Sequence, residues 1–401
     1  MRENFYRKVL DNGMTILFEK RDLPIVSVAF AVRNGGINEA LDEKGISHFI
    51  EHMLYKGTPT RNSKKIAEEI EKNGGQLNGF TSEVITAYWC KMPSKHLNIA
   101  LEVLADMVKN PLFNEKELEK ERLVIFEEMK MIKDTPQRYV LDKIQRFLYE
   151  PEMFLDVIGT FETMNSIDRD KIFKKFKEVY TPNNMVLCVV GDADFHEIID
   201  FVKKNFGNEK ESIPNFRAQL KNKSGVEKRK GIDQANLVFA YHVPTFKDKK
   251  SYAAIVLSTL TAEGMSSRLF SEIREKRNLA YSVKGSSEIT NDFGYNFIYV
   301  GTMKENVEKV KEIILREFEK VSDDLGEEEL EKVKEQIIGN YYLEMEDSQS
   351  QMVNLLYYEL DNKVEDFYNF DKFIKEVKVN DVRELAKSAK EKYSFFALVP
   401  E

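Results

Sequence analysis

The stretch EKELEKERLVIFEEM (residues 115–129) returns in altered form as EEELEKVKEQIIGNY (327–341). Around this repeat, both halves of the chain show the same order of hydrophobic patterns. Each half starts with apolar strand-like segments, continues with amphipathic helical segments and ends on a short apolar strand. Such a repeat predicts two copies of one domain within a single chain.

The expected strands and helices follow from these patterns. Asn12-Gly13 predicts a hairpin turn between two N-terminal strands. In the first half, strands are expected within 5–33 and at 80–92 and 185–191, and helices at 44–56, 63–74 and 96–148, with breaks near Pro111 and Pro136. In the second half, strands are expected at 235–243, 295–303 and 393–400, and helices at 251–261, 266–278 and 304–349.

These elements predict an α+β fold of two homologous domains, each a mostly antiparallel sheet packed with helices. The N-terminal domain is expected over residues 1–206 and the C-terminal domain over residues 229–401. The polar stretch between them, residues 207–228, is expected to be the linker.

Composition excludes several classes of function. The net charge of −8 argues against a nucleic-acid partner, and no apolar run is long enough to span a membrane. The N-terminal residues lack the apolar core of a secretory signal. Cys90 and Cys188 lie in apolar strand-like runs and are expected to be buried and reduced. We therefore expect a cytoplasmic protein.

Residues 45–58, GISHFIEHMLYKGT, place two of the five histidines one helical turn apart. A helix advances about 100° per residue, so His48, Glu51 and His52 share one face. The opposite face is apolar and consists of Ile46, Phe49, Ile50, Met53 and Leu54. H-x-x-E-H is the inverted zincin motif, with two zinc ligands and a glutamate as general base. The pattern alone is equally compatible with two surface histidines on an amphipathic helix.

A catalytic zinc needs a third protein ligand, and the acidic stretch 114–131 offers several. Asn114 is suited to cap a helix there, with Glu117 at the capping-box position. Glu121 and Glu128 are seven residues apart and so lie on the same face of that helix. Spacing does not choose between them, because any glutamate of so acidic a helix could simply be solvated.

Four segments together resemble the pitrilysin family of zinc peptidases, in the shorter branch that includes the mitochondrial processing peptidase. They are HFIEHMLYKGT (48–58), NGFTSEVITAYW (78–89), KERLVIFEEM (120–129) and GMSSRLFSEIREKRNLAYSV (264–283). Their order and spacing match the family, and the resemblance covers essentially the whole chain. It implies a half clamshell like that of the processing peptidase.

By this resemblance, His48, His52 and Glu128 are the ligands of one Zn²⁺. Glu51 is then the general base for the attacking water. Glu121 is expected to orient the metal ligands or to assist proton transfer, without binding the metal itself.

The repeat limits the number of zinc sites. The second half contains no H-x-x-E-H and carries Val333 and Asn340 where the first half has Glu121 and Glu128. One zinc per chain is therefore expected.

The resemblance also implies residues that hold the substrate. Asn78, Gly79 and Phe80 would lie nearest the scissile bond, on an edge strand that binds an extended peptide. Without the family, this stretch would be an ordinary sheet strand. Arg274 and Tyr281 would grip the peptide backbone and stabilise the oxyanion, whereas the residues alone suggest a salt-bridged arginine and a core tyrosine.

In the short-chain branch the Arg/Tyr pair reaches the zinc from a partner subunit, so a homodimer is implied. The expected function is that of a zinc metalloendopeptidase acting on short or unfolded peptides. The segment TAEGMSSRLF (261–270) lacks a long glycine-rich loop like that in the noncatalytic subunit of the processing peptidase, which argues against presequence docking. The alternatives are a noncatalytic scaffold subunit, or a catalytic subunit active only beside a zinc-less paralogue.

Overall fold

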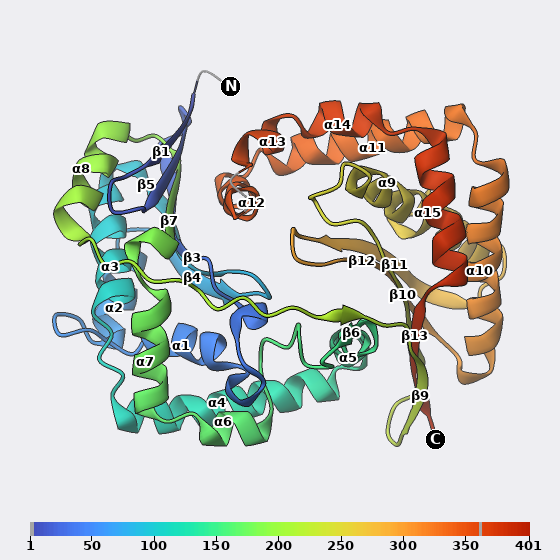
Figure 1. The fold of residues 1–401 in the computed structure, drawn as a ribbon, viewed down its shortest axis with the longest axis horizontal. Coiled ribbons are helices and arrows are strands. Elements are labelled where there is room, and N and C mark those ends of the chain that lie inside the picture. Colours follow the sequence, from blue (N-terminus) through green and yellow to red (C-terminus); the bar gives the residue numbers. More distant parts are fainter. Residues whose placement is uncertain (1–3, 361–362) are drawn as a thin grey trace. The chain divides into compact units, whose positions relative to one another are not determined.

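The computed structural model describes residues 4–360 and 363–401. The chain forms two compact units from interleaved segments (Figure 1). The first unit consists of Met1–Met129, Leu155–Arg217 and Glu344–Tyr368, and the second of Lys130–Phe154, Ala218–Leu343 and Asn369–Glu401. Each unit has a mostly antiparallel sheet packed with helices, which confirms the predicted α+β fold.

The sheet of the first unit has six strands in the order β1-β2-β7-β3-β5-β4. The strands are β1 (Phe5–Val9), β2 (Thr15–Lys20), β3 (Ile25–Val32), β4 (Gln76–Thr81), β5 (Thr86–Pro93) and β7 (Met185–Gly191). All neighbouring strands run antiparallel except β2 and β7. β3 and β7 are buried almost throughout, as is typical of strands covered on both faces.

Helices cover both faces of this sheet. The helices of the first unit are α1 (Ile46–Leu54), α2 (Ser63–Glu71), α3 (Leu97–Lys109), the first part of α4 (Glu115–Asp134), α6 (Phe161–Ser166), α7 (Arg169–Val179), α8 (Phe195–Asn205), α12 (Ser348–Glu359) and α13 (Val364–Tyr368). α3 lies against β3 and β5, and α1 lies against β4 and β5. The side chains of Val28 and Phe30 join the core on this face.

The main sheet of the second unit has five strands in the order β11-β12-β10-β13-β9. The strands are β9 (Ser224–Arg229), β10 (Ala235–His242), β11 (Ala280–Ile289), β12 (Gly294–Thr302) and β13 (Ser394–Pro400), and β6 (Tyr149–Glu150) pairs separately with β8 (Gln219–Leu220). The helices are α5 (Pro136–Leu148), α9 (Ser251–Ala262), a π-helical turn (Phe270–Glu275), α10 (Val307–Asp324), α11 (Glu327–Glu344), α14 (Phe370–Glu376) and α15 (Val379–Glu391).

The two sheets have equivalent topology. Read from the β4 edge, the first sheet runs β4-β5-β3-β7-β2, and the second runs β11-β12-β10-β13-β9, with one parallel pair at the same place. Phe30 pairs with Tyr88, which pairs with Gly79. In the second sheet, Phe239 pairs with Ile298, which pairs with Gly285. The register therefore agrees with an internal duplication.

Each unit takes one helix from the other half of the chain. α12 packs on β7 and β3 of the first unit, where the hydroxyl oxygens of Ser348 and Ser27 lie 2.9 Å apart. At the other end of α12, the fully buried Glu359 accepts hydrogen bonds from Arg7 and Arg33. α5 packs on β13 and β10 of the second unit.

The structure differs from the predicted elements in one strand near the motif. The single strand expected at 80–92 is a hairpin, with β4 and β5 joined by a turn. The hydroxyl of Ser82 accepts from the N–H groups of Val84 and Ile85 and donates to the carbonyl oxygen of Ile85, which stabilises the turn. β4 is consequently the edge of the sheet.

Part of the expected linker, residues 207–228, forms β8 and all but the last residue of β9. Short 3-10 turns occur at Gly36–Asn38, Leu41–Glu43, Ser94–His96, Pro182–Asn184 and Lys304–Asn306. Within the described residues, no helix is both long and apolar enough to cross a membrane.

Candidate metal centre

Helix α1 carries the predicted motif and is fixed at its start. The carboxylate of Glu39 accepts hydrogen bonds from the N–H groups of Gly45 (2.9 Å) and Ser47 (2.7 Å). These N–H groups belong to the first turn of the helix and lack helical partners. The predicted apolar residues of α1 are all buried in the core of the first unit. The opposite face is therefore held in a fixed orientation.

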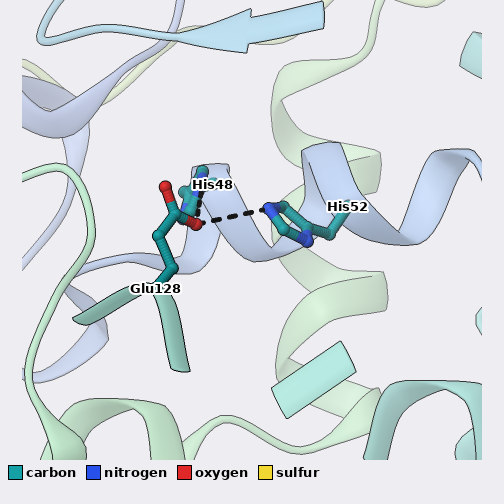
Figure 2. Close-up of side chains that lie close together, drawn as sticks. All are labelled: His48, His52 and Glu128. Carbon is teal, nitrogen blue, oxygen red and sulfur yellow. Dashed lines mark ion pairs between the residues drawn. The ribbon is translucent and has the colours of Figure 1, made fainter. Parts of the chain in front are cut away.

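His48, His52 and Glu128 converge at one point (Figure 2). Oε2 of Glu128 lies 3.6 Å from Nε2 of His48 and 3.8 Å from Nε2 of His52. One ligand atom from each residue lies within 4.8 Å of the others, and within the described parts of the chain no other such group was found.

The donor set fits zinc. Ligands at about 2.0–2.1 Å from a tetrahedral zinc are roughly 3.4 Å from one another. The Glu128 distances of 3.6 Å and 3.8 Å need only small adjustments to match. Two imidazole nitrogens and one carboxylate oxygen are also the composition typical of a catalytic zinc site with one position left for water.

Glu121 supports His52 from behind. Its Oε2 lies 3.1 Å from Nδ1 of His52, and its Oε1 lies 2.5 Å from Nζ of Lys56. A carboxylate on the distal nitrogen of a ligating histidine fixes the ring orientation and the tautomer. The structure thus separates the two glutamates that spacing left open: Glu128 faces the histidine Nε2 atoms and Glu121 does not.

The electrostatics of the two histidines differ. Burial, followed by the neighbouring His52, lowers the pKa of His48 to about 3. Burial also opposes the charged form of His52, but the hydrogen bond with Glu121 and the nearby carboxylates outweigh it and raise the pKa of His52. His48 is therefore neutral near pH 7, which is the form that binds a metal.

Glu51 lies beside the ligands and next to β4. Burial raises the pKa of its carboxyl group, against the hydrogen bond from Thr81. The hydroxyl of Thr81 donates to Oε2 of Glu51 at 2.8 Å. A carboxylate of raised pKa beside a metal site is suited to general acid–base chemistry.

The three residues implied for substrate binding all lie on β4. Gly79 lies close to Glu51, because a Cβ placed on it would be 3.3 Å from Oε1 of Glu51. The ring of Phe80 stacks on Tyr357 of α12, with centroids 6.3 Å apart. The side chain of Asn78 accepts from the N–H of Gly79. Their role towards a substrate stays a prediction.

Arg274 and Tyr281 lie together in the second unit. The guanidinium of Arg274 is 4.7 Å from the centroid of the Tyr281 ring and donates to the Tyr281 carbonyl oxygen. The Tyr281 side chain is 78% exposed, which contradicts the alternative of a core tyrosine. The predicted substrate-gripping role of this pair stays a prediction.

Two residues at the site were missed by the sequence reasoning. Thr81 alternates with Gly79 along β4, so strand periodicity places both on the same face. Tyr55 follows Glu51 by four residues, so helical periodicity places it on the polar face of α1. Both signals were present in the sequence.

Comparisons with known proteins show what the chain is similar to. A family model described as Insulinase (Peptidase family M16) matches residues 15–158, and one described as Peptidase M16 inactive domain matches residues 166–337. The chain is 34% identical over 359 residues to uncharacterized zinc protease YmxG of Bacillus subtilis, covering 86% of each sequence.

Solved structures share the fold. A protease from Helicobacter pylori matches with a TM-score of 0.91 at 22% identity, covering 99% of both chains. A peptidase M16 inactive domain protein from Pseudomonas fluorescens matches with a TM-score of 0.88 at 19% identity, covering 99% of this chain and 98% of that one.

Proposed function

Because the chain belongs to the M16 family of peptidases, we propose that it is a zinc-dependent endopeptidase that hydrolyses short or unfolded peptides. The observation that carries the proposal is the grouping of His48, His52 and Glu128 around one point. Relatives named zinc proteases support zinc as the metal. The single group of candidate ligands within the described residues supports one ion per chain.

In this proposal the three ligands hold the metal and Glu51 performs proton transfer. A zinc ion in such a site supplies Lewis acidity and lowers the pKa of a water molecule to about 7. Glu51 accepts a proton from the attacking water and later gives it to the leaving amine. The hydrogen bond from Thr81 keeps one carboxylate oxygen in place during both steps.

An extended peptide would add to the free edge of β4. Its backbone hydrogen bonds would supply affinity for any sequence in extended form, which suits unfolded substrates. The edge position of β4 and the absence of a side chain at Gly79, beside Glu51, support this placement.

A homodimer completes the proposal. The exposed Tyr281 and the neighbouring Arg274 of one copy would contact the peptide at the metal centre of the other, where a phenol can stabilise an oxyanion. The two free cysteines are buried, in keeping with a cytoplasmic protein.

Cleavage of a quenched fluorogenic peptide library tests the function. Purified protein is expected to cut unstructured peptides, to lose activity with a zinc chelator and to regain it with added Zn²⁺. Glu51→Gln should keep one zinc per chain, measured by elemental analysis, and lose activity by at least about a hundredfold because it cannot accept the proton.

Turnover retained in Glu51→Gln would exclude Glu51 as the base. A folded wild-type protein that binds one zinc per chain and cuts no peptide would contradict the proposal for the chain on its own. Cleavage that begins only after a zinc-less paralogue is added would then identify a heterodimeric enzyme.

A noncatalytic scaffold subunit is the alternative, suggested by the description of the second family model as an inactive domain. That model matches residues 166–337, most of which belong to the second half. In that half Val333 stands in place of Glu121, and Asn340, just beyond the match, stands in place of Glu128. The description therefore fits the half without metal ligands, whereas the first half keeps all three. This contrast favours the peptidase.

A further inference from the structure

The hydroxyl of Tyr55 is a buried polar group without a hydrogen-bond partner among the described residues. Tyr55 directly follows helix α1, four residues after Glu51. Residues four apart on a helix are neighbours on its surface, so the phenol and the carboxylate lie on the same side. The negative charge of Glu51 acts on Tyr55 and, together with the larger effect of burial, raises the pKa of the phenol.

Gly79 locates the two oxygens relative to each other. A Cβ built on Gly79 would lie 2.5 Å from the Tyr55 hydroxyl and 3.3 Å from Oε1 of Glu51. The hydroxyl and Oε1 thus lie around the same point beneath β4. Thr81, two residues further along β4, already binds the other oxygen, Oε2.

The surroundings show that this hydroxyl is not simply part of a satisfied network. The neighbouring phenols of Tyr88 and Tyr180 bind each other, with their oxygens 2.6 Å apart. The Tyr55 and Tyr88 rings are close, with centroids 6.0 Å apart, yet the Tyr55 oxygen takes no part in that bond. A buried hydroxyl left unpaired destabilises a fold, whereas phenylalanine would fill the same space without that penalty.

We propose that Tyr55 is a positioning residue, whose hydroxyl donates to Oε1 of Glu51 when water and peptide occupy the site. With Thr81 on Oε2, both oxygens of the carboxylate are then held, and the group cannot rotate away from the attacking water. Hydrogen bonds of this kind are often loose in an empty site and tighten in the substrate complex. The proposal rests on the proposed peptidase function.

Tyr55→Phe tests this role, because it removes only the hydroxyl. We expect kcat to fall roughly ten- to hundredfold, since a hydrogen bond to a charged group is lost in the transition state. KM and the zinc content should not change, because neither peptide nor metal is bound by this oxygen. The Tm should stay the same or rise, because an unpaired buried group has been removed.

Tyr180→Phe is the matched control. It removes a phenol that is hydrogen-bonded to Tyr88 and leaves that partner unpaired, so the Tm should fall while kcat stays unchanged. Tyr55→Phe is therefore expected to lower kcat without lowering the Tm, and Tyr180→Phe to lower the Tm without lowering kcat.

An unchanged kcat in Tyr55→Phe, with an active wild-type enzyme, would overturn the positioning role alone. A lower kcat accompanied by a lower Tm and a changed KM would assign Tyr55 a structural role and overturn the proposal as well. A zinc-loaded wild-type enzyme without activity would overturn both the peptidase function and this inference.

Discussion

Glu121 is a buried glutamate of α4 that contacts the Nδ1 atom of His52 rather than the Nε2 atoms that Glu128 faces. It is 7% exposed and bridges His52 and Lys56. We expect Glu121→Gln to weaken zinc binding by about ten- to a hundredfold, because the charge that orients and polarises His52 is lost. Competition with a chromophoric chelator measures this affinity.

Glu117→Gln is the control for this change. Glu117 lies one turn earlier on the same helix and pairs with the exposed Lys120. Its loss should leave zinc affinity within error of wild type. Equal affinities in both variants would mean that Glu121 has no supporting role.

For the individual residues of the site, helical periodicity alone predicted that His48, Glu51 and His52 lie on one face of α1. The choice of Glu128 over Glu121 needed the family resemblance, because both glutamates share one face of their helix. The structure brings Glu128 to both histidines, a long-range contact that no local pattern encodes. Tyr55 was missed because an aromatic residue at a helix end is usually read as core.

The connection between α1 and α2 is held by one acidic residue of α3. The carboxylate of Asp106 accepts hydrogen bonds from the hydroxyls of Thr58 and Thr60 and from the guanidinium of Arg61. Burial alone would raise the pKa of Asp106, but these bonds outweigh it and hold the pKa at about 2. The turn that follows α1 is therefore anchored to a core helix by a charged group.

The lowered pKa makes this anchor sensitive to acid. An acid with a folded-state pKa of about 2 and an ordinary value of 3.8 stabilises the fold above about pH 4. That contribution is lost as the pH falls towards 2. Asp106→Asn should lower the free energy of unfolding at pH 7 by about 1 kcal/mol, after allowance for screening by solvent.

Urea denaturation at several pH values measures this effect. The difference in the free energy of unfolding between wild type and Asp106→Asn should become smaller as the pH falls from 4 to 2. Asp200→Asn changes an exposed carboxylate on α8 and is the control. Its free energy of unfolding should stay close to that of wild type at every pH. If the difference in the free energy of unfolding between wild type and Asp106→Asn did not depend on pH, the stabilisation by Asp106 would not be electrostatic.

At the scale of elements, the long periodic segments were predicted well. α3, α4 and α5 fall within the helical stretch expected at 96–148, and both expected breaks occur. The hairpin of β4 and β5 was missed because its turn contains neither glycine nor proline and depends on the Ser82 side chain. β11 was missed because it is an edge strand with many polar residues.

The two structural units of the molecule do not correspond to the first and second halves of the sequence. The second unit contains α5 from the first half, and the first unit contains α12 from the second half. A fragment of residues 1–206 would therefore expose the apolar face of α5 and leave β3 and β7 uncovered where α12 packs. Large exposed apolar areas of this kind promote aggregation.

Cleavage within 207–223 of the intact chain tests this organisation. We expect fragment 1–206 produced alone to aggregate or to lack cooperative unfolding. The intact protein, nicked at a protease site inserted in that segment, should keep its circular dichroism and its size on gel filtration. A monomeric 1–206 fragment with a Tm near that of the whole chain would contradict the interleaved organisation.

The duplication itself was predictable from the repeated helix sequence, but the exchange of helices was not. Local patterns identify α5 as a helix without stating which sheet it covers. Residues 348–359 of α12 lie almost entirely beyond the last helical stretch predicted from the sequence, which ended at residue 349. The two helices nevertheless occupy equivalent positions in the repeat. The alignment of α4 with α11 places Pro136 opposite Ser348, and these are the first residues of α5 and α12. Tertiary packing, which a single sequence does not encode locally, decides the rest.

The reciprocal placement of these helices carries information about descent. If both halves arose from one ancestral gene, a lone ancestral product would have had a sheet face with nothing to cover it. Two copies could cover each other by each giving the helix that became α5 in one half and α12 in the other. The exchange of α5 and α12 therefore has the form of a domain swap contained within one polypeptide.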